Sequence, residues 1–244
     1  MPPAQSQPPF LSTQQMREVD RAMIEDYKIS LLQMMENAGR CLADLARSRF
    51  LRGDPRGQRV LVLAGTGGNG GGGLVCARRL HNWGARVRVL MTADSQRLGD
   101  VARHQHSILE RMGIETDVAA DEGELPDGDL VVDALIGYSL RGAPSGVTAS
   151  LIRAANSQTA PVLSLDVPSG VDTTTGTVHE PSVSATATMT LALPKEGLRE
   201  VEARAAVGEL YLADISVPPS LYAGPTLGLD VGPIFHESDV IRVW

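Results

Sequence analysis

Three groups of residues in this chain have the types and spacing that chemistry on a small molecule requires. A glycine-rich segment, Gly65 to Gly73, directly follows one short apolar run, Asp133 lies near the end of a second, and Asp166 directly follows a third. Glycine leaves backbone N–H groups free to bind a phosphate. A carboxylate can transfer protons or ligate a cation. Together the three groups predict a site for a phosphorylated small molecule with acid–base chemistry beside it.

The apolar runs alternate with helical patterns along the chain. Short runs rich in Val and Leu, without polar alternation, are typical of strands that are buried on both faces. We expect strands at 59–64, 86–91, 114–118, 129–135, 161–165, 185–193 and 209–215, and helices at 74–83, 98–112 and 146–157. This alternation predicts an α/β fold with a mainly parallel sheet covered on both faces. Because ligands bind at the carboxyl ends of parallel strands, the three groups should meet at one edge of the sheet.

Two helices are expected before the first strand. Two capping-box patterns mark their starts, Ser12 with Gln15 and Ser30 with Gln33, and each is followed by apolar residues at helical spacing. No clear domain break or internal repeat follows. We therefore expect one domain with two terminal extensions, divided as a disordered or extended arm at 1–11, a single domain at 12–217, and an irregular tail packed on the domain at 218–244.

Composition restricts the class of protein. The net charge is −7 and Lys and Arg form no cluster, which argues against binding to a nucleic-acid backbone. No segment reaches the roughly 20 apolar residues of a membrane span, and the N-terminus lacks the basic and apolar regions of a signal peptide. Cys41 and Cys76 have no metal-binding spacing and fall in predicted helices. We expect a cytoplasmic protein with reduced thiols and neither a nucleic-acid nor a membrane partner.

The glycine segment by itself allows another interpretation. Gly65, Gly67 and Gly70 match the G-x-G-x-x-G fingerprint of dinucleotide-binding proteins, and Asp94, after the next strand, could bind a ribose. This pattern would fit an NAD-linked oxidoreductase. The fingerprint usually opens a domain, however, whereas two helices precede it here, and the catalytic residues of a dehydrogenase are not evident. No Gly-Lys-Ser/Thr follows, so a Walker A loop is excluded.

The order of the motifs resembles the NAD(P)H-hydrate epimerase family, whose fold is also called the YjeF N-terminal domain. The resemblance covers about residues 12 to 217 and rests on Met16–Met23, Leu32–Gly39, the glycine segment, Val132–Gly137 with Gly142, Asp166–Asp172, Pro194–Leu198 and Ala213–Pro218. It implies a Rossmann-like three-layer αβα sandwich that forms a homodimer. It also implies an isomerase that interconverts the R and S hydrates of NADH and NADPH (NADHX and NADPHX) in cofactor repair. A separate ATP- or ADP-dependent dehydratase, for which 244 residues leave no room, would then restore the cofactor.

The same resemblance assigns roles to particular residues. It implies one K⁺ per subunit, associated with Asn69, Asp133 and Ser169. It further implies that the nucleotide substrate contacts the glycine segment, the segment after Asp133 and one aspartate. The corresponding residues are Gly68, Asn69, Gly70, Gly71, Gly72, Gly137, Tyr138, Ser139, Leu140, Arg141, Gly142, Ala143 and Asp166.

The glycine segment departs from the family at two positions. Relatives usually carry Gly-Asn-Asn-Gly-Gly-Asp-Gly, whereas this chain has Gly68 in place of the first Asn and Gly72 in place of the Asp, and it retains Asn69. Loss of the carboxylate removes one group that could bind a ribose or transfer a proton. A non-catalytic nucleotide-binding or interaction module of the same fold is therefore an alternative to an epimerase.

The chemistry of a hydrated nicotinamide indicates which carboxylate should act on it. The hydrate carries its OH on the carbon beside a ring nitrogen, so loss of hydroxide to an iminium-like species and re-addition from the other face inverts that carbon. One carboxyl group could protonate the departing oxygen and then activate water, best with its pKa raised toward neutral by burial. We expect Asp166 in this catalytic role and Asp133 as a permanently ionised ligand of the cation.

These side chains also have purely structural interpretations. An Asp at a strand end often caps a helix or forms a turn. Ser169 could cap the turn after Pro168, and Asn69 could supply a left-handed backbone conformation. Lys195 could reach a substrate phosphate, but we expect it at the surface.

Overall fold

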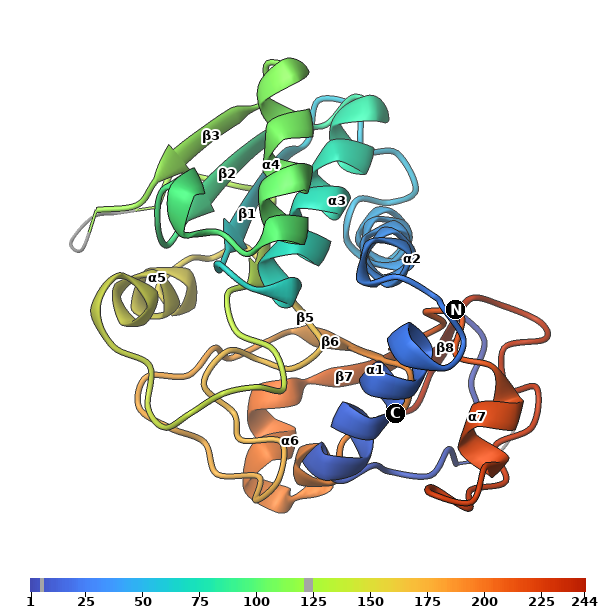
Figure 1. Ribbon diagram of the computed structural model, residues 1–244. Helices are drawn as coiled ribbons and strands as arrows, with labels where there is room; N and C mark the ends of the chain where they lie inside the picture. Colours follow the sequence, from blue (N-terminus) through green and yellow to red (C-terminus); the bar gives the residue numbers. More distant parts are fainter. Residues whose placement is uncertain (5–6, 121–124) are drawn as a thin grey trace.

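Strands form one eight-stranded sheet in the computed structural model, which describes residues 1–4, 7–120 and 125–244 (Figure 1). In their order across the sheet they are β3 (Glu115–Val118), β2 (Arg86–Met91), β1 (Arg59–Ala64), β4 (Leu130–Ala134), β5 (Val162–Leu165), β6 (Ala187–Leu191), β7 (Glu209–Ala213) and β8 (Val240–Arg242). Every neighbouring pair is parallel except β7 and β8. The predicted mainly parallel sheet is confirmed. Each expected strand is present with the same or shorter bounds, and the largest difference is at β6, which was expected at 185–193 and spans Ala187–Leu191.

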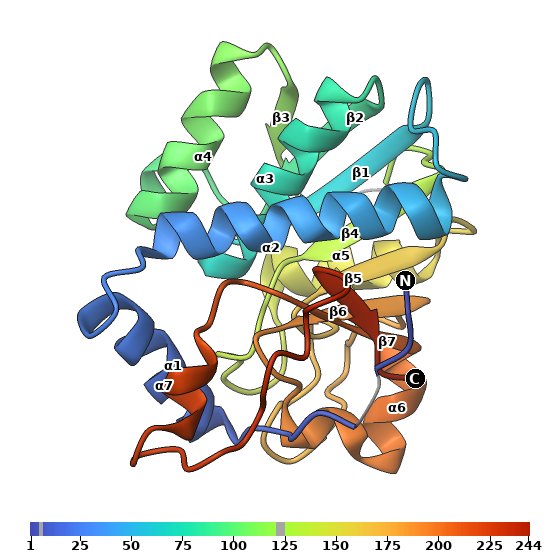
Figure 2. The same cartoon turned by 90° about the vertical axis from the view of Figure 1, so that its right-hand side faces the viewer.

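Helices cover both faces of the sheet (Figure 1 and Figure 2). Their bounds are α1 (Thr13–Glu25), α2 (Leu31–Leu45) with a π-helical turn at Ala46–Phe50, α3 (Gly68–Asn82), α4 (Asp100–Arg111), α5 (Gly146–Asn156), α6 (Val201–Val207) and α7 (Pro219–Ala223), with short 3₁₀ turns at Ser95–Arg97 and Glu196–Arg199. Helices α2, α3 and α4 share a buried cluster with one face of the sheet, and α5 shares another with the opposite face. The Rossmann-like three-layer αβα class is confirmed.

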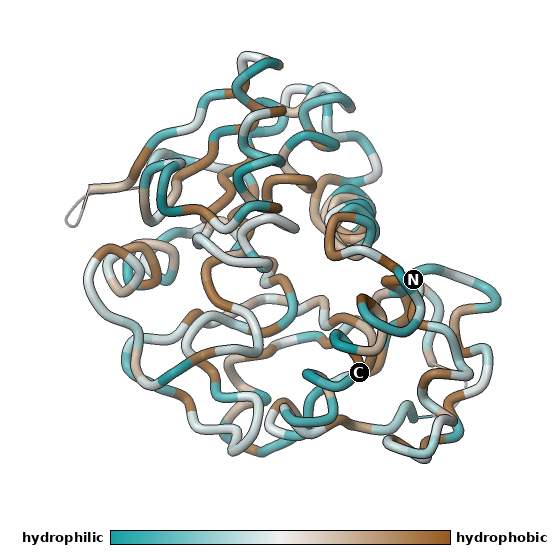
Figure 3. The backbone as a smooth tube through the Cα atoms, in the orientation of Figure 1, coloured by the Kyte–Doolittle hydropathy of each residue, from teal (hydrophilic) through white to brown (hydrophobic). Residues whose placement is uncertain are grey.

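Strand β1 shows why the central strands are apolar throughout. Val60 and Val62 belong to the cluster beneath α2, α3 and α4, whereas Leu61 and Leu63 belong to the cluster beneath α5. A strand in the middle of a covered parallel sheet has no solvated face, so both sets of alternating side chains must be apolar. Figure 3 shows apolar stretches recurring along the strands.

Both N-terminal helices begin at the predicted capping boxes. Ser12 Oγ accepts a hydrogen bond from Gln15 N, and Gln15 Oε1 accepts one from Ser12 N. Ser30 and Gln33 form the same reciprocal pair at the start of α2. The apolar side of α1 packs against the first half of α2 and against residues that follow β6. These helices therefore cover the sheet near the carboxyl ends of its strands.

Helix α3 begins at Gly68, so the prediction of a loop that extends to Gly73 is wrong. The glycines form the first turns of the helix because it approaches its neighbours too closely for side chains. A Cβ at Gly73 would lie 2.5 Å from Ala134 Cβ, and a Cβ at Gly70 would lie 1.9 Å from the carbonyl oxygen of Gly65. These glycines thus serve close helix packing, and only the first of them are free to face a ligand.

The two terminal segments run along the β7 side of the sheet. In the expected arm 1–11, of which residues 5–6 lie outside the described residues, Pro3 bridges to Arg242 and the fully buried Leu11 bridges to Lys195. The expected tail 218–244 includes α7 and β8, so it is more regular than the sequence suggested. Strand β8 pairs with β7, which would otherwise be an unpaired edge. The chain ends lie on the same side of the molecule (Figure 2).

Two further features concern the whole chain. Cys41 and Cys76 are buried and unpaired in helices, and burial raises the pKa of both thiols. Across the part of the chain that the structure describes, no helix is both long enough and apolar enough to cross a membrane.

Candidate active site

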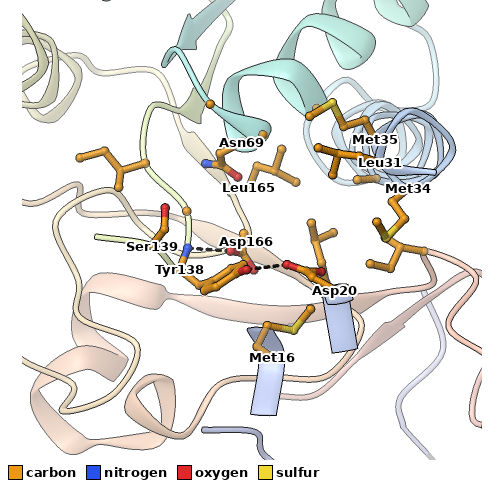
Figure 4. Close-up of a pocket in the computed structure, with 18 of the residues that line it drawn as sticks. Met16, Asp20, Leu31, Met34, Met35, Asn69, Tyr138, Ser139, Leu165 and Asp166 are labelled. Atoms are coloured by element: carbon orange, nitrogen blue, oxygen red, sulfur yellow. Dashed lines mark hydrogen bonds between the residues drawn. The ribbon is translucent and has the colours of Figure 1, made fainter. Parts of the chain in front are cut away.

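A pocket of about 490 Å³ lies at the carboxyl ends of the central strands (Figure 4). Its lining comes from α1, α2, the first turns of α3, the ends of β5 and β6, and the segments that follow β1, β4, β5, β6 and β7. Strands β1 and β4 are neighbours, and the sheet order runs to β2 on one side of this pair and to β5 on the other. Such a reversal of strand order opens a crevice in which α/β proteins bind their ligands.

Asp166 forms a buried ion pair with Lys195 in this pocket. Lys195 Nζ lies 2.5 Å from Asp166 Oδ1, and it also donates to Thr190 Oγ1 at 3.2 Å and to the Leu191 carbonyl at 3.0 Å. The Lys195 and Asp166 side chains are only 1% and 5% exposed. The expectation that Lys195 lies at the surface is therefore wrong. Its ammonium balances the charge of Asp166, which is a paired carboxylate and not an isolated buried acid.

The backbone around Asp166 fixes the other carboxylate oxygen. Asp166 adopts a left-handed conformation with φ 66°, which is uncommon outside glycine and marks a constrained position. Its Oδ2 accepts a hydrogen bond from Tyr138 N at 2.9 Å. A Cβ at Gly137 would lie 3.0 Å from this same oxygen, so the close approach of the segment after β4 requires glycine there.

Asp20 of α1 also lines the pocket, and sequence reasoning did not select it. Its Oδ2 accepts a hydrogen bond from Tyr138 Oη at 2.5 Å (Figure 4). Burial raises the pKa of Asp20, and the hydrogen bond from Tyr138 opposes this rise only in part. A signal was present in the sequence: Asp20 follows Met16 by four residues and precedes Met23 by three. This spacing puts a carboxylate on the buried side of an amphipathic helix. A charge there is costly unless it is compensated, so such a residue indicates a functional site.

Asp133 lies beneath the pocket, in a network of hydrogen bonds. It is fully buried and accepts hydrogen bonds from Ser169 N at 2.9 Å, Ser169 Oγ at 2.6 Å, Ser164 Oγ at 2.8 Å and Leu135 N at 3.2 Å. Burial raises the pKa of Asp133 in spite of these donors. No cationic side chain among the described residues is hydrogen-bonded to it. The permanently ionised form expected from the sequence therefore needs a positive charge from elsewhere.

Asn69 lies in the first turn of α3, next to Gly137 of the segment that follows β4 and Asp133. Its backbone conformation is helical and not left-handed, so the purely structural interpretation of Asn69 as a left-handed residue is wrong. A Cβ at Gly137 would lie 3.3 Å from Asn69 Oδ1, and the preceding residue, Ile136, donates its N–H to Ser169 Oγ at 2.9 Å. Within the described residues, the buried Asn69 Nδ2 has no hydrogen-bond partner. Of the three residues predicted to hold a cation, Asp133 and Ser169 are thus in direct contact. Asn69 is separated from them by the segment 136–137, which it contacts at Gly137.

The start of α3 faces the pocket with free backbone donors. Thr66, Gly67, Gly68 and Asn69 all line it, and no side chain in the described part of the chain caps this helix. The first N–H groups of a helix have no partner within the helix and carry its positive end. An anionic group such as a phosphate is the ligand that this arrangement favours.

The residues that were predicted to contact the substrate fall into two sets. Those that line the pocket are Gly68, Asn69, Gly72, Gly137, Tyr138, Ser139 and Asp166. Those outside its lining are Gly70 and Gly71, which are buried within the helix packing, and Leu140, Arg141, Gly142 and Ala143. Asp94 also lies outside the lining, where its side chain caps the turn at Ser95–Arg97.

Gly72, which replaces the carboxylate usual in relatives, lies in apolar surroundings. A Cβ at this position would lie 2.8 Å from Leu165 Cδ2 and 4.0 Å from Ala38 Cβ. Leu165 lines the pocket directly before Asp166. The space of the missing side chain is therefore partly filled by an apolar wall of the pocket.

Fold and pocket together define a class of protein. It is a doubly wound α/β protein whose ligand site lies at the reversal of strand order, with a helix N-terminus and a buried carboxylate–ammonium pair. Residues 31–197 match the family described as YjeF-related protein N-terminus, and the chain belongs to this family.

Several curated proteins are similar over most of the chain. An NAD(P)H-hydrate epimerase of Dehalogenimonas lykanthroporepellens is 48% identical over 208 residues, which is 85% of this chain and 82% of that protein. An NAD(P)H-hydrate epimerase of Rhodopirellula baltica is 35% identical, over 91% of this chain and 89% of that protein. A bifunctional NAD(P)H-hydrate repair enzyme Nnr of Moorella thermoacetica is 34% identical over 88% of this chain, which spans only 42% of that enzyme.

One solved structure supports the fold. The crystal structure of yeast ynu0, YNL200c, is similar with a TM-score of 0.79 and covers 96% of this chain and 99% of the yeast chain. The sequence identity is 24%, so this similarity concerns the fold alone.

Proposed function

We propose that this chain is an NAD(P)H-hydrate epimerase, an isomerase that interconverts the R and S forms of NADHX and NADPHX. Its family and its similarity to curated epimerases over most of both chains support this function. The observation that carries it is the buried Asp166–Lys195 pair at the floor of the pocket. A carboxylate in this position can take a proton from water at a reacting carbon.

The substrate carries a hydroxyl on the carbon beside a ring nitrogen. Inversion requires this C–O bond to break, the nitrogen lone pair to form an iminium-like C=N bond, and water to add from the other face. Asp166 accepts the proton of the incoming water, since it lines the pocket and the ammonium of Lys195 is hydrogen-bonded to its Oδ1. Tyr138 N holds the second oxygen of Asp166, which fixes the direction in which the carboxylate faces the pocket.

The rest of the pocket suits the other parts of a nucleotide. The open N-terminus of α3 offers backbone N–H groups to a phosphate. Met35 and Leu165 give the pocket apolar walls, which bind a ring and limit the access of bulk water to it. In this proposal α3 recognises the phosphate, and the segments after β4 and β5 carry out the proton transfer.

We also propose one K⁺ per subunit, held by the oxygen atoms of Asn69, Asp133 and Ser169. Carboxylate, amide and hydroxyl oxygens suit a hard cation, and the buried Asp133 has no cationic partner among the described residues. The Asn69 amide, which lacks a partner for its buried Nδ2, can turn its oxygen toward such an ion. When bound, K⁺ supplies the positive charge that stabilises the ionised Asp133 and the segment 136–137. Described residues contain no group of three or more His, Cys, Asp or Glu side chains suited to another metal.

Further parts of the proposal concern the setting of the enzyme. We propose a cytoplasmic homodimer that works with a separate ATP- or ADP-dependent dehydratase. The bifunctional name of the longer Nnr relatives supports this functional link. Analytical ultracentrifugation of the purified chain tests the dimer, and a monomer at micromolar concentration would contradict it.

A coupled assay tests the proposed function. Pure R-hydrate is mixed with ATP and an excess of an S-specific dehydratase, and NADH absorbance is followed with and without this chain. We expect recovery faster than the spontaneous rate, and an Asp166→Asn variant slower by roughly 10²–10⁴-fold. Asp94→Asn, which changes an aspartate outside the pocket, is the matched control. Folded wild-type protein without any acceleration would contradict the proposal and favour a non-catalytic nucleotide-binding module. Oxidation of a substrate by NAD without the dehydratase would favour an oxidoreductase.

A further inference from the structure

Proton transfer in the pocket needs a donor as well as an acceptor. The titratable side chains that line it, among the described residues, are Asp20, Tyr138, Asp166 and Lys195. Lys195 already donates to three protein oxygens, and Asp166 is its carboxylate partner. Neither is therefore placed to give a proton to a departing hydroxyl, which leaves Asp20 and Tyr138.

Tyr138 connects the two carboxyl groups of the pocket. Its backbone N–H donates to Asp166 Oδ2 at 2.9 Å, and its hydroxyl donates to Asp20 Oδ2 at 2.5 Å. Figure 4 shows both hydrogen bonds, one from Tyr138 to Asp166 and one from Tyr138 to Asp20. The second oxygen of Asp20 has no hydrogen bond to the protein among the described residues, so it can carry a proton.

The surroundings of Asp20 differ from those of Asp166. Asp20 lies between Met16 and the apolar residues of the pocket and has no ion-pair partner among the described residues, whereas Asp166 has Lys195. Burial is the largest influence on Asp20 and raises its pKa. The charge of Asp166 also raises it, while the hydrogen bond from Tyr138 and the charge of Lys195 lower it. The charge of Asp20 in turn contributes to raising the pKa of Tyr222 of α7. Two carboxyl groups in such different environments are suited to opposite roles in proton transfer.

We propose that Asp20 is a second catalytic carboxyl group of this pocket, the general acid that protonates the departing hydroxyl while Asp166 acts as the general base. This inference rests on the proposed epimerase function. The Asp20 proton passes to the hydroxyl oxygen, the C–O bond breaks with its electron pair, and water leaves as the ring nitrogen forms the C=N bond. Water then attacks the other face, the C=N pair returns to nitrogen, and the water proton passes to Asp166. One conversion moves a proton from Asp20 to Asp166, and the reverse conversion or solvent returns it.

The pH dependence of kcat/KM separates this role from a structural one. Asp20 must be protonated to act, so the wild-type rate should fall as the pH rises through the pKa of Asp20. Asp20→Asn should lower kcat by roughly 10²-fold or more and abolish this alkaline fall. Asp20→Glu should restore part of the rate together with the alkaline fall. Thermal melting of each variant shows that it is folded.

Tyr138→Phe provides a second, independent measurement. The variant removes the hydrogen bond that lowers the pKa of Asp20, so the alkaline fall should move to higher pH. If Asp20 had only a packing role, Tyr138→Phe would reduce the rate without changing the pH at which the rate falls. Wild-type kcat in Asp20→Asn, or an unmoved alkaline fall in both Asp20→Asn and Tyr138→Phe, would overturn the inference. Inactivity of the wild-type protein would instead contradict the proposed function itself.

Discussion

Lys195 Nζ and Asp166 Oδ1 lie 2.5 Å apart although the two residues are 29 positions apart in sequence. The pairing joins the segment after β6 to the end of β5, and both side chains are almost completely buried. A buried pair of this kind is costly to break because either partner alone leaves an uncompensated charge.

Loss of Lys195 should therefore destabilise the fold through Asp166. We expect Lys195→Met to lower the free energy of unfolding by about 3–5 kcal/mol. The double variant Lys195→Met/Asp166→Asn should recover much of this loss, since no unpaired charge remains. Urea denaturation of the four proteins of this cycle measures the coupling. Effects that add to within about 0.5 kcal/mol would show that the two side chains do not interact.

A carboxylate at position 72, which the family pattern usually has there, should lower the stability of this chain. Gly72→Asp places a Cβ 2.8 Å from Leu165 Cδ2 and a charge beside Ala38. We expect a loss of about 1–3 kcal/mol in the free energy of unfolding, reduced when Leu165→Ala is added. Gly68→Ala is the matched control, because a Cβ there meets only Met35 Cε at 3.5 Å. Equal stability of Gly72→Asp and wild type would contradict the apolar packing described here.

Potassium should stabilise the folded protein through Asp133. A ligand that binds only the folded state at about 100 times its Kd adds roughly 2.7 kcal/mol. We expect the melting temperature to rise with KCl but not with choline chloride of equal ionic strength. The rise should be absent in Asp133→Asn and retained in Asp94→Asn, which alters a carboxylate outside the pocket. A rise that persists in Asp133→Asn would place the ion elsewhere.

The ion pair between Arg49 and Glu209, which is remote from the pocket, should contribute to the loss of folding stability at acid pH. Hydrogen bonds from Arg49 are the main cause that lowers the pKa of Glu209 from 4.5 to about 2. A lowered pKa gives stability that is present above pH 4.5 and lost as the pH falls through the window from 4.5 to about 2. Both side chains are partly exposed, so solvent screening reduces the effect to roughly 1 kcal/mol. Glu209→Gln should flatten the stability curve in this window, and an unchanged curve would contradict the assignment.

The sequence predicted the sheet and its ligand edge because both follow from local patterns. Short Val- and Leu-rich runs such as Arg59–Ala64 indicate buried parallel strands, and the carboxyl ends of such strands lie at one edge. Strand β8 and helix α7 were not foreseen, since a three-residue strand and a one-turn helix have no periodic pattern to detect. The start of α3 was missed because a run of glycines is typical of a loop, whereas close contacts such as that of Gly73 with Ala134 require it in a helix.

Site residues that depend on tertiary contacts could not be assigned from local patterns. Lys195 looks like a surface residue until β6 places it beside Asp166. Asp20 belongs to a helix that precedes the whole sheet, and only packing brings it to Tyr138. Asp133 was correctly located at a strand end, but its complete burial depends on Ser164 and Ser169 from later segments.

Direct observation of the inverted carbon tests the central claim. Stereochemically pure R-NADHX is incubated with the wild-type protein and with Asp166→Asn, and the R and S forms are separated by chromatography over time, without any dehydratase. We predict that the wild type brings the two forms to their equilibrium ratio far faster than buffer alone. Asp166→Asn, which lacks the general base, should be slower than the wild type by roughly 10²–10⁴-fold. A wild-type protein that is folded, yet leaves the R-form to convert at the spontaneous rate, would contradict the account.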